Sequence, residues 1–287
     1  MPELPDLWYI ERYLRRHVVG RQITDVSIKR PVVIRSAAGV PFADTLRGKK
    51  VTGVRIHGPF LHFTLTERVD LIMNFMLTGR LQHQRTSEKE GGHRCFNLTL
   101  DDGSKLNYLD DQMMGKIYLT RSGEYSQIPR FLEQGLAIRS PAYTLKAFRA
   151  LLKDHGRKQV HVVMIDQTLL SAIGHAYADE ILFDAGIHPK TWVRDLSEEQ
   201  MSRLHTSIRN VIDWGFKMVS DAREPIHVKV RDHMKVRLRH GKPCTRCGTK
   251  IRREGVRGWD VYFCPKCQPA TRPLFIDWNR MRHTLPR

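Results

Sequence analysis

The chain has 287 residues, with 48 Lys+Arg against 30 Asp+Glu, so its formal net charge is +18 at pH 7 and its isoelectric point is about 10.0. This charge favours a polyanionic partner, with nucleic acid as the first candidate and an acidic membrane surface as the rival. Because no apolar run approaches the ~20 residues of a membrane span and no basic amphipathic anchor stands out, we expect a soluble intracellular protein that does not bind membranes.

The first residues predict a helix. Apolar side chains at positions 7, 10, 14 and 18 recur on one helical face. Pro5 suits the first turn, Asp6 is favoured at the positive end of the helix dipole, and Gly20 ends the pattern. We expect this helix to lead into the first folded domain.

From about residue 23 to residue 119 the apolar pattern has a period of two, which is typical of strands. Short alternating segments lie at Val51–Ile56, Phe60–Thr64, Leu71–Phe75 and Phe96–Leu100. With the first helix they predict an antiparallel β-sandwich domain over residues 1–135. Cys95 lies in this strand-like region, and we expect an ordinary buried thiol there.

The pattern becomes helical near Ser140-Pro141. Amphipathic runs cover residues 145–152 and 168–185, and a third begins at Ser197, after a sharp turn at residues 186–189. These runs predict a helical domain over residues 136–240. Its last part, residues 221–239, is polar and carries alternating basic side chains up to Arg239, which we interpret as a basic approach to the segment that follows.

Four cysteines near the C-terminus have the spacing of a zinc site. Cys244 and Cys247 form one CxxC pair, and Cys264 and Cys267 form the second. Residues 259–263 read as the return strand of a hairpin between the pairs, and metal binding would supply most of the folding energy of such a small unit. Two disulfides or four unrelated thiols are the alternatives, and the lack of a secretory signal disfavours disulfides. We therefore predict one structural zinc ion in a finger over residues 241–268, followed by an extension at 269–287.

Several motifs occur together in a specific order. They are Pro2-Glu3-Leu4-Pro5, residues 173–180 (IGHAYADE), residues 185–189 (AGIHP) and residues 241–268 around the cysteines. In combination they resemble the formamidopyrimidine-DNA glycosylase and endonuclease VIII family of base-excision repair enzymes. The resemblance implies an α+β multidomain fold: an N-terminal β-sandwich with a leading helix, a helix-two-turn-helix domain and a zinc-finger hairpin, with DNA between the domains.

The N-terminus can carry nucleophilic chemistry. Removal of Met1 before a small residue would expose the secondary amine of Pro2, and an α-amino group titrates near ~8 rather than near ~10 as a lysine does. Attack of this amine on the sugar C1′ would expel the base and form an iminium, and Glu3 is placed to transfer protons. The resemblance implies the same two roles. The alternative is that Pro2 and Pro5 only rigidify the start of the helix.

Other positions depart from the family. A lysine that holds a phosphate in the family's sandwich is Pro59 here, and the loops that fill the gap left by a flipped base read Leu77-Thr78-Gly79 and residues 111–115. Three apolar wedges remain for DNA binding, namely Leu77, Met113 and Met114. The arginine that would read the orphaned base is missing, so the selectivity for the opposite base is expected to differ.

Two further DNA contacts are altered. His175 takes the place of an asparagine that binds phosphate in the family, and it can donate to phosphate, more strongly when protonated; the alternative is a capping or packing histidine. Trp259 takes the place of a phosphate-binding arginine in the finger, and a longer hairpin would keep Arg257 at its tip. Arg239 is the remaining candidate contact.

Two classes of function fit these observations. The first is a monomeric DNA glycosylase with AP-lyase activity that excises a damaged base and cleaves the strand by β- or β,δ-elimination, in the cytoplasm or, in a bacterium, at the nucleoid. The departures then point to a different lesion, or to single-stranded, bulged or cross-linked DNA. The second is a catalytically weakened DNA-binding protein on the same scaffold that recognises damaged or non-duplex DNA. A zinc-ribbon RNA or ribosomal protein fits the charge but not the N-terminus.

Overall fold

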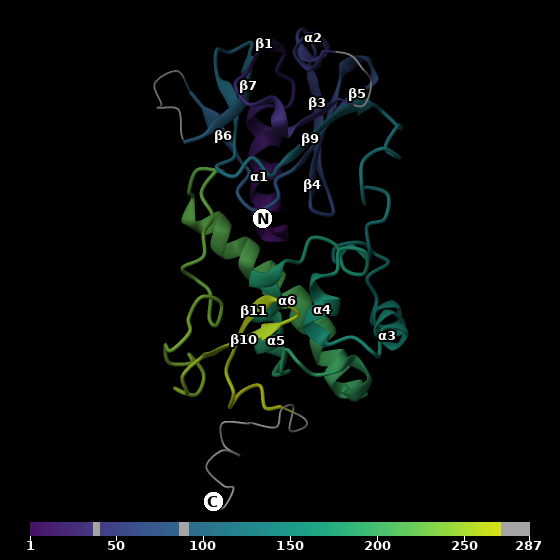
Figure 1. Ribbon diagram of the computed structural model, residues 1–287, viewed down its shortest axis with the longest axis vertical. Helices are drawn as coiled ribbons and strands as arrows, with labels where there is room; N and C mark the ends of the chain where they lie inside the picture. The colour runs from purple at the N-terminus through teal and green to yellow at the C-terminus, as the bar shows by residue number, and fades with distance from the viewer. Residues whose placement is uncertain (37–40, 86–91, 271–287) are drawn as a thin grey trace, which may run out of the picture. The chain divides into compact units, whose positions relative to one another are not determined.

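The computed structural model describes residues 1–36, 41–85 and 92–270 (Figure 1). The chain divides into two compact units. The sandwich unit contains Met1–Ser140, Gln167–Gly174 and Ile212–His233. The helix–finger unit contains Pro141–Asp166, His175–Val211 and the described part of Met234–Arg287. Three separate stretches of sequence therefore build each unit.

The sandwich unit begins with the predicted helix, α1, Leu4–His17. Leu7, Ile10 and Leu14 are buried on one face of it, and they join side chains of both sheets in the core. Gly20 has a φ of 91°, in the left-handed region that lets the chain leave the helix without a Cβ clash. The helix ends at His17, and Gly20 lies two residues beyond its C-cap, Val18.

Two sheets form the sandwich. One has the order β1-β7-β8-β6, from Ile23–Ile28, Arg94–Leu100, Lys105–Leu109 and Arg80–Gln84. The other has the order β2-β9-β5-β4-β3, from Ile34–Ser36, Lys116–Arg121, Val69–Asn74, Phe60–Leu65 and Val51–His57. Short helical segments lie between strands: η1 (Pro31–Val33), α2 (Phe42–Leu46) and η2 (Thr66–Arg68).

The predicted β-sandwich is confirmed, with one correction to its pairing. All four predicted alternating segments coincide with strands, β3, β4, β5 and β7. The sheet is not purely antiparallel, because the short edge strand β2 pairs with β9 in parallel. Cys95 is fully buried in β7, as expected, and burial raises the pKa of its thiol to about 11.

The helix–finger unit carries four further helical segments: α3 (Leu145–Asp154), α4 (Val160–Ile165), α5 (His175–Ala185) and η3 (Val193–Asp195). The last helix, α6, runs from Glu198 to Ala222, so the division between the two units falls within it. None of the helices in the described part of the chain combines the length and the apolar character that a membrane crossing requires.

The predicted helix over residues 168–185 is wrong in its first part. Residues 167–174 are turns that belong to the sandwich unit, and Leu170 forms an isolated bridge with Leu136. Ala172 has a φ of 63°, which no α-helix contains. The local apolar pattern favours a helix, but backbone hydrogen bonds to residues distant in sequence override it.

The finger is a two-stranded hairpin of β10, Arg252–Val256, and β11, Trp259–Phe263. It packs within its unit against α5, because Phe183 shares a small apolar cluster with Val236, Ile251 and Tyr262. The Arg246 guanidinium lies over the Phe183 ring at 4.3 Å and pairs with Asp184 at 3.1 Å. The return strand predicted at residues 259–263 is confirmed.

Candidate active site and zinc site

Glu3 precedes α1 and is held by a loop distant in sequence. It is only 5% exposed, and its Oε2 accepts a hydrogen bond from the Gly174 N–H at 3.0 Å. The Leu4 N–H donates to the Ala172 carbonyl at 2.9 Å. A Cβ at position 174 would lie 2.6 Å from the Glu3 Cδ, so only glycine allows this approach. The loop that the sequence misassigns as helix is therefore what positions the carboxyl group.

Asp6 anchors the start of the same helix. The Glu3 N–H donates to its Oδ2 at 2.8 Å, and the Arg231 guanidinium donates to both of its oxygens, at 2.8 and 2.6 Å. A bidentate pair of this kind fixes geometry as well as charge. The basic run before the finger predicts a path toward the finger, but Arg231 and Lys229 instead belong to the sandwich unit.

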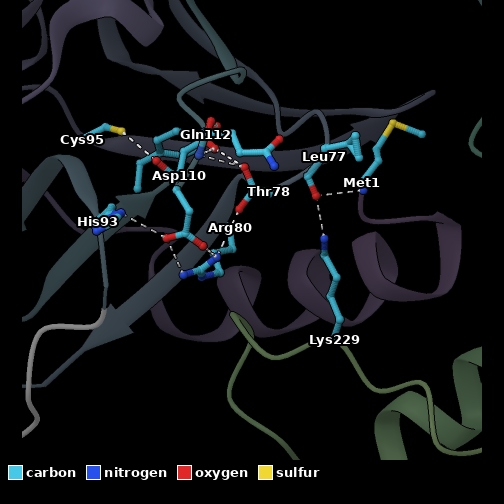
Figure 2. Close-up of polar contacts among 11 residues, drawn as sticks. Met1, Leu77, Thr78, Arg80, His93, Cys95, Asp110, Gln112 and Lys229 are labelled. Carbon is cyan, nitrogen blue, oxygen red and sulfur yellow. Dashed lines mark hydrogen bonds and ion pairs between the residues drawn. The ribbon is translucent and has the colours of Figure 1, made fainter.

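The N-terminal amine lies beside Lys229. The Met1 amine donates to the Leu77 carbonyl oxygen at 3.1 Å, and the Lys229 ammonium donates to the same oxygen at 2.9 Å (Figure 2). Pro2 lines one cavity with Asp6, Lys229 and other residues. Burial and the Lys229 charge lower the pKa of the Met1 amine to about 5. An α-amine with a pKa this low is mostly unprotonated at neutral pH.

The three predicted wedge residues are exposed apolar side chains on two loops of the sandwich unit. Leu77, Met113 and Met114 are 50%, 41% and 44% exposed, although side chains of this type are usually buried. Met113 has a φ of 53°, a strained conformation for a residue with a Cβ. The structure thus presents these side chains to solvent from the loops that the sequence identifies.

Asp110 connects the two loops, and the sequence offers no signal for it. This buried carboxylate accepts hydrogen bonds from the Thr78 hydroxyl, from the Gln112 N–H at 3.3 Å and from the Gly115 N–H at 2.7 Å (Figure 2). Arg80 joins the same loops through a bidentate pair with Asp111, at 2.7 and 3.1 Å. These contacts hold the exposed Leu77, Met113 and Met114 on a common support.

Pro59 is buried in the turn between β3 and β4 and brings no charge to it. The ring N–H of the neighbouring His57 donates a hydrogen bond from Nε2 to the Phe131 carbonyl oxygen at 2.6 Å. The position at which the resemblance implies a lysine is therefore an apolar residue in a turn of this chain.

The four finger cysteines form a metal site. Their sulfur atoms all lie within 4.8 Å of one another, and the separations across the pairs are 3.9 Å for Cys244–Cys267 and 3.5 Å for Cys247–Cys264. Four sulfurs at ~2.3 Å from a tetrahedral zinc are about 3.8 Å apart, whereas a disulfide needs about 2 Å. The donor set and its size fit a structural zinc ion, and the alternative of disulfides is excluded.

The hairpin has a two-residue turn at Arg257-Gly258, where both residues have positive φ, 47° and 84°. This is the geometry of a type I′ turn. Arg257 lies at the tip of the hairpin and is exposed, as the sequence predicts. Arg239 lies before the finger, where its guanidinium donates to the Pro243 carbonyl at 3.4 Å.

His175 is the first residue of α5, and its ring lies between two others. The Trp259 ring is 4.5 Å away and the His161 ring is 5.6 Å away, measured between centroids. Burial, followed by the charge of Arg237, lowers the pKa of His175 to about 4. A pKa this low favours a neutral His175 ring, and the ring contacts favour the packing alternative.

The fold and these sites define a class: an α+β protein with a β-sandwich, a helical segment and a four-cysteine finger, and with an amine and a carboxyl group at the start of its first helix. Three family models match in succession. They are the formamidopyrimidine-DNA glycosylase N-terminal domain at residues 1–117, the H2TH domain of the same enzyme at 135–224, and the zinc finger found in FPG and IleRS at 241–270.

Whole-chain comparisons agree. The formamidopyrimidine-DNA glycosylase of Desulfitobacterium hafniense is 30% identical over 275 residues, covering 93% of this chain and 100% of the relative. That of Heliobacterium modesticaldum is 32% identical over 280 residues, with coverages of 93% and 100%. The crystal structure of MutM (FPG) from Thermus thermophilus has a TM-score of 0.80 at 30% identity and covers 93% of this chain and 98% of its own.

A Lactococcus lactis Fpg in complex with DNA that contains an abasic site has a TM-score of 0.84 at 25% identity, with coverages of 93% and 100%. The chain belongs to the formamidopyrimidine-DNA glycosylase family. The resemblance that the sequence motifs indicate, the α+β fold class and the structural zinc are thereby confirmed.

Proposed function

We propose that this chain, a DNA repair glycosylase by family, excises a damaged base with the Pro2 amine as nucleophile and Glu3 as proton donor, and then cleaves the strand by β- or β,δ-elimination. One observation carries this proposal: Pro2 lines a cavity and is followed directly by Glu3, whose carboxyl group is buried and accepts a hydrogen bond from the Gly174 N–H. The lowered pKa of the Met1 amine supports it, because burial and the Lys229 charge at this end of the chain favour an unprotonated amine, whose lone pair is required for attack.

The amine lone pair forms a bond to C1′, the glycosidic C–N bond breaks, and the base leaves with that electron pair and takes up a proton. Glu3 gives a proton to the sugar ring oxygen, which opens the ring and leaves an iminium on C1′. The iminium acidifies the 2′ hydrogen, whose loss expels the 3′ phosphate. Water then adds to C1′ of the iminium, which releases the sugar fragment as an aldehyde and restores the Pro2 amine with loss of a proton.

Borohydride trapping on a panel of lesion and abasic-site DNAs tests this function. Reduction of the iminium should join the protein covalently to the DNA, and peptide mapping should place the link at Pro2. A trimmed protein that traps on no abasic DNA, single- or double-stranded, would favour the catalytically weakened DNA-binding protein on the same scaffold. The apolar Pro59 is the observation that favours this second possibility.

We further propose that Leu77, Met113 and Met114 fill the space that a flipped nucleotide leaves in the base stack. Their exposure and their common support by Asp110 favour this role. Arg257 at the hairpin tip and Arg239 before the finger are the proposed phosphate contacts, and His175 is proposed to contact DNA as a neutral ring. All of these groups lie on one chain, so a monomer suffices, and the cytoplasm or nucleoid is the proposed location.

Phosphate contacts should dominate the affinity for DNA, given the net charge of +18. We expect the apparent affinity to fall by ~1000-fold or more between 50 and 200 mM salt if six or more phosphates are neutralised, because each contact releases a counterion. Fluorescence anisotropy over a salt series measures the slope. An affinity that hardly changes over this range would contradict DNA as the main partner.

Trp259 favours a more specific substrate: DNA with unpaired bases, as in single-stranded, bulged or cross-linked sites. The side chain is 52% exposed, and one side of it packs against the His175 ring, which in turn packs on the buried His161. A supported aromatic ring with a free side can stack on any base that is not already stacked in a duplex. Because His175 is neutral, this group of rings offers stacking rather than charge.

Replacing Trp259 by Ala should lower the affinity for single-stranded DNA by ~5- to 100-fold, the worth of one base stacked on an aromatic side chain. The affinity for intact duplex should change less, because its bases are already stacked. Trp259→Phe is the matched control and should keep most of the single-strand affinity. Equal losses on both DNAs, at unchanged zinc content, would show that Trp259 supports the hairpin instead.

A further inference from the structure

Lys229 lies in a basic polar segment, yet its ammonium group contacts the backbone beside the N-terminus. Its ammonium and the Met1 amine both donate to the Leu77 carbonyl oxygen, at 2.9 and 3.1 Å (Figure 2). The two nitrogens therefore cannot be farther apart than the sum of these distances. Pro2 and Lys229 also line the same cavity. The proposed nucleophile and a positive charge thus face one cavity.

Two acidic and two basic side chains act on the Met1 amine and on Lys229. Glu3 and Asp6 at the start of α1 act on the amine in the direction that raises its pKa. Both oxygens of Asp6 accept hydrogen bonds from Arg231, which offsets its negative charge. Arg80 and Arg231 add positive charge near Lys229. The pKa of the Met1 amine is therefore lowered by burial and by the Lys229 charge, and raised by the carboxylates of Glu3 and Asp6.

We propose that Lys229 is a positioning residue, whose ammonium holds the Leu77 carbonyl and keeps the neighbouring N-terminal amine unprotonated for attack on C1′. This rests on the proposed function, because it matters only if the amine is the nucleophile. Two neighbouring ammonium groups repel, and the α-amine gives up its proton first because its unperturbed pKa is near ~8 whereas that of lysine is near ~10. A cation beside a desolvated amine is an established way to activate it.

The pKa shifts agree with this geometry. Burial first, and then the Lys229 charge, lower the pKa of the Met1 amine from 8.0 to about 5. Burial lowers the pKa of Lys229 as well. Removing the Lys229 charge takes away one of the causes that lower the amine pKa. The acid limb of iminium formation should then move to higher pH.

The experiment compares Lys229→Met and Lys229→Arg in protein that begins at Pro2. Single-turnover borohydride trapping on abasic-site DNA is followed from about pH 4 to pH 9, with saturating protein. In Lys229→Met the acid limb should move up by about one pH unit or more, which lowers the trapping rate about tenfold on that limb. Lys229→Arg keeps the charge and should remain near the wild-type profile.

Lys217→Met is the control for the loss of one charge. Lys217 is an exposed residue of α6 that pairs with Asp221 at 2.5 Å and does not line the cavity of Pro2, so its profile should match the wild type. A Lys229→Met profile that coincides with the wild type would overturn the proposal. So would an Arg variant that shifts as far as the Met variant, or peptide mapping that places the DNA link on Lys229 itself.

A measurement on the wild-type protein tests the proposal even if a Lys229 variant fails to fold. Labelling proline with ¹⁵N allows the Pro2 amine to be titrated directly by NMR. We expect its pKa well below the ordinary ~8, and a value at or above ~8 would overturn the role of Lys229. Failure of the wild type to trap any abasic DNA would instead remove the nucleophile assignment, so the two failures are distinguishable.

Discussion

Protein that retains a blocked N-terminus is expected to lose base excision and strand cleavage by ~1000-fold or more, while it still binds DNA. With Met1 or a tag in place, the Pro2 nitrogen is part of an amide, whose lone pair is delocalised and cannot attack C1′. The DNA contacts proposed for Arg239, Arg257 and the apolar wedges do not involve this nitrogen. Blocking the N-terminus should therefore abolish base excision and leave the affinity for DNA unchanged.

The measurement compares one preparation before and after proteolytic removal of an N-terminal tag that leaves Pro2 first. The two proteins are otherwise identical, so folding and DNA affinity serve as internal controls. Borohydride trapping and single-turnover excision should appear only after cleavage. Tagged protein that traps as well as the trimmed protein would place the nucleophile elsewhere, and Lys229, which lines the same cavity as Pro2, would then be tested.

Removal of one zinc ligand should have the second large effect. Cys244→Ser or Cys267→Ser is expected to abolish stoichiometric zinc binding and to reduce DNA affinity, because a structural zinc contributes ~10–16 kcal/mol to the folding of a finger. The finger shares its apolar cluster with Phe183 of α5, so the helix–finger unit should lose stability as well. The sandwich unit has its own core and should remain folded.

Zinc content by mass spectrometry and DNA affinity by anisotropy test this prediction. Cys95→Ala is the matched control, because Cys95 is buried in β7 of the sandwich unit and lies outside the four-sulfur site. It should keep its zinc even if it lowers the melting temperature. A full complement of zinc in either Ser variant would argue against four-cysteine ligation.

The sequence by itself determined the features that depend on spacing within a short segment. The two CxxC pairs predict the zinc site, because four thiolates at that spacing close around one ion. The period of two over residues 51–100 predicts strands, and the apolar positions of α1 predict its buried face. Arg257 is predicted at the hairpin tip, where only a turn of two residues separates the strands.

The tertiary structure alone decided which distant residues meet. Residues 168–174 have a local pattern that favours helix, yet Gly174 and Ala172 bond to Glu3 and Leu4 instead. Lys229 is read locally as part of a basic approach to the finger, but its ammonium lies against Leu77. Asp110 gives no local signal and still connects both wedge loops. In each case the partner is more than 30 residues away or belongs to another loop, and hydrogen bonds of that range leave no periodicity in the sequence.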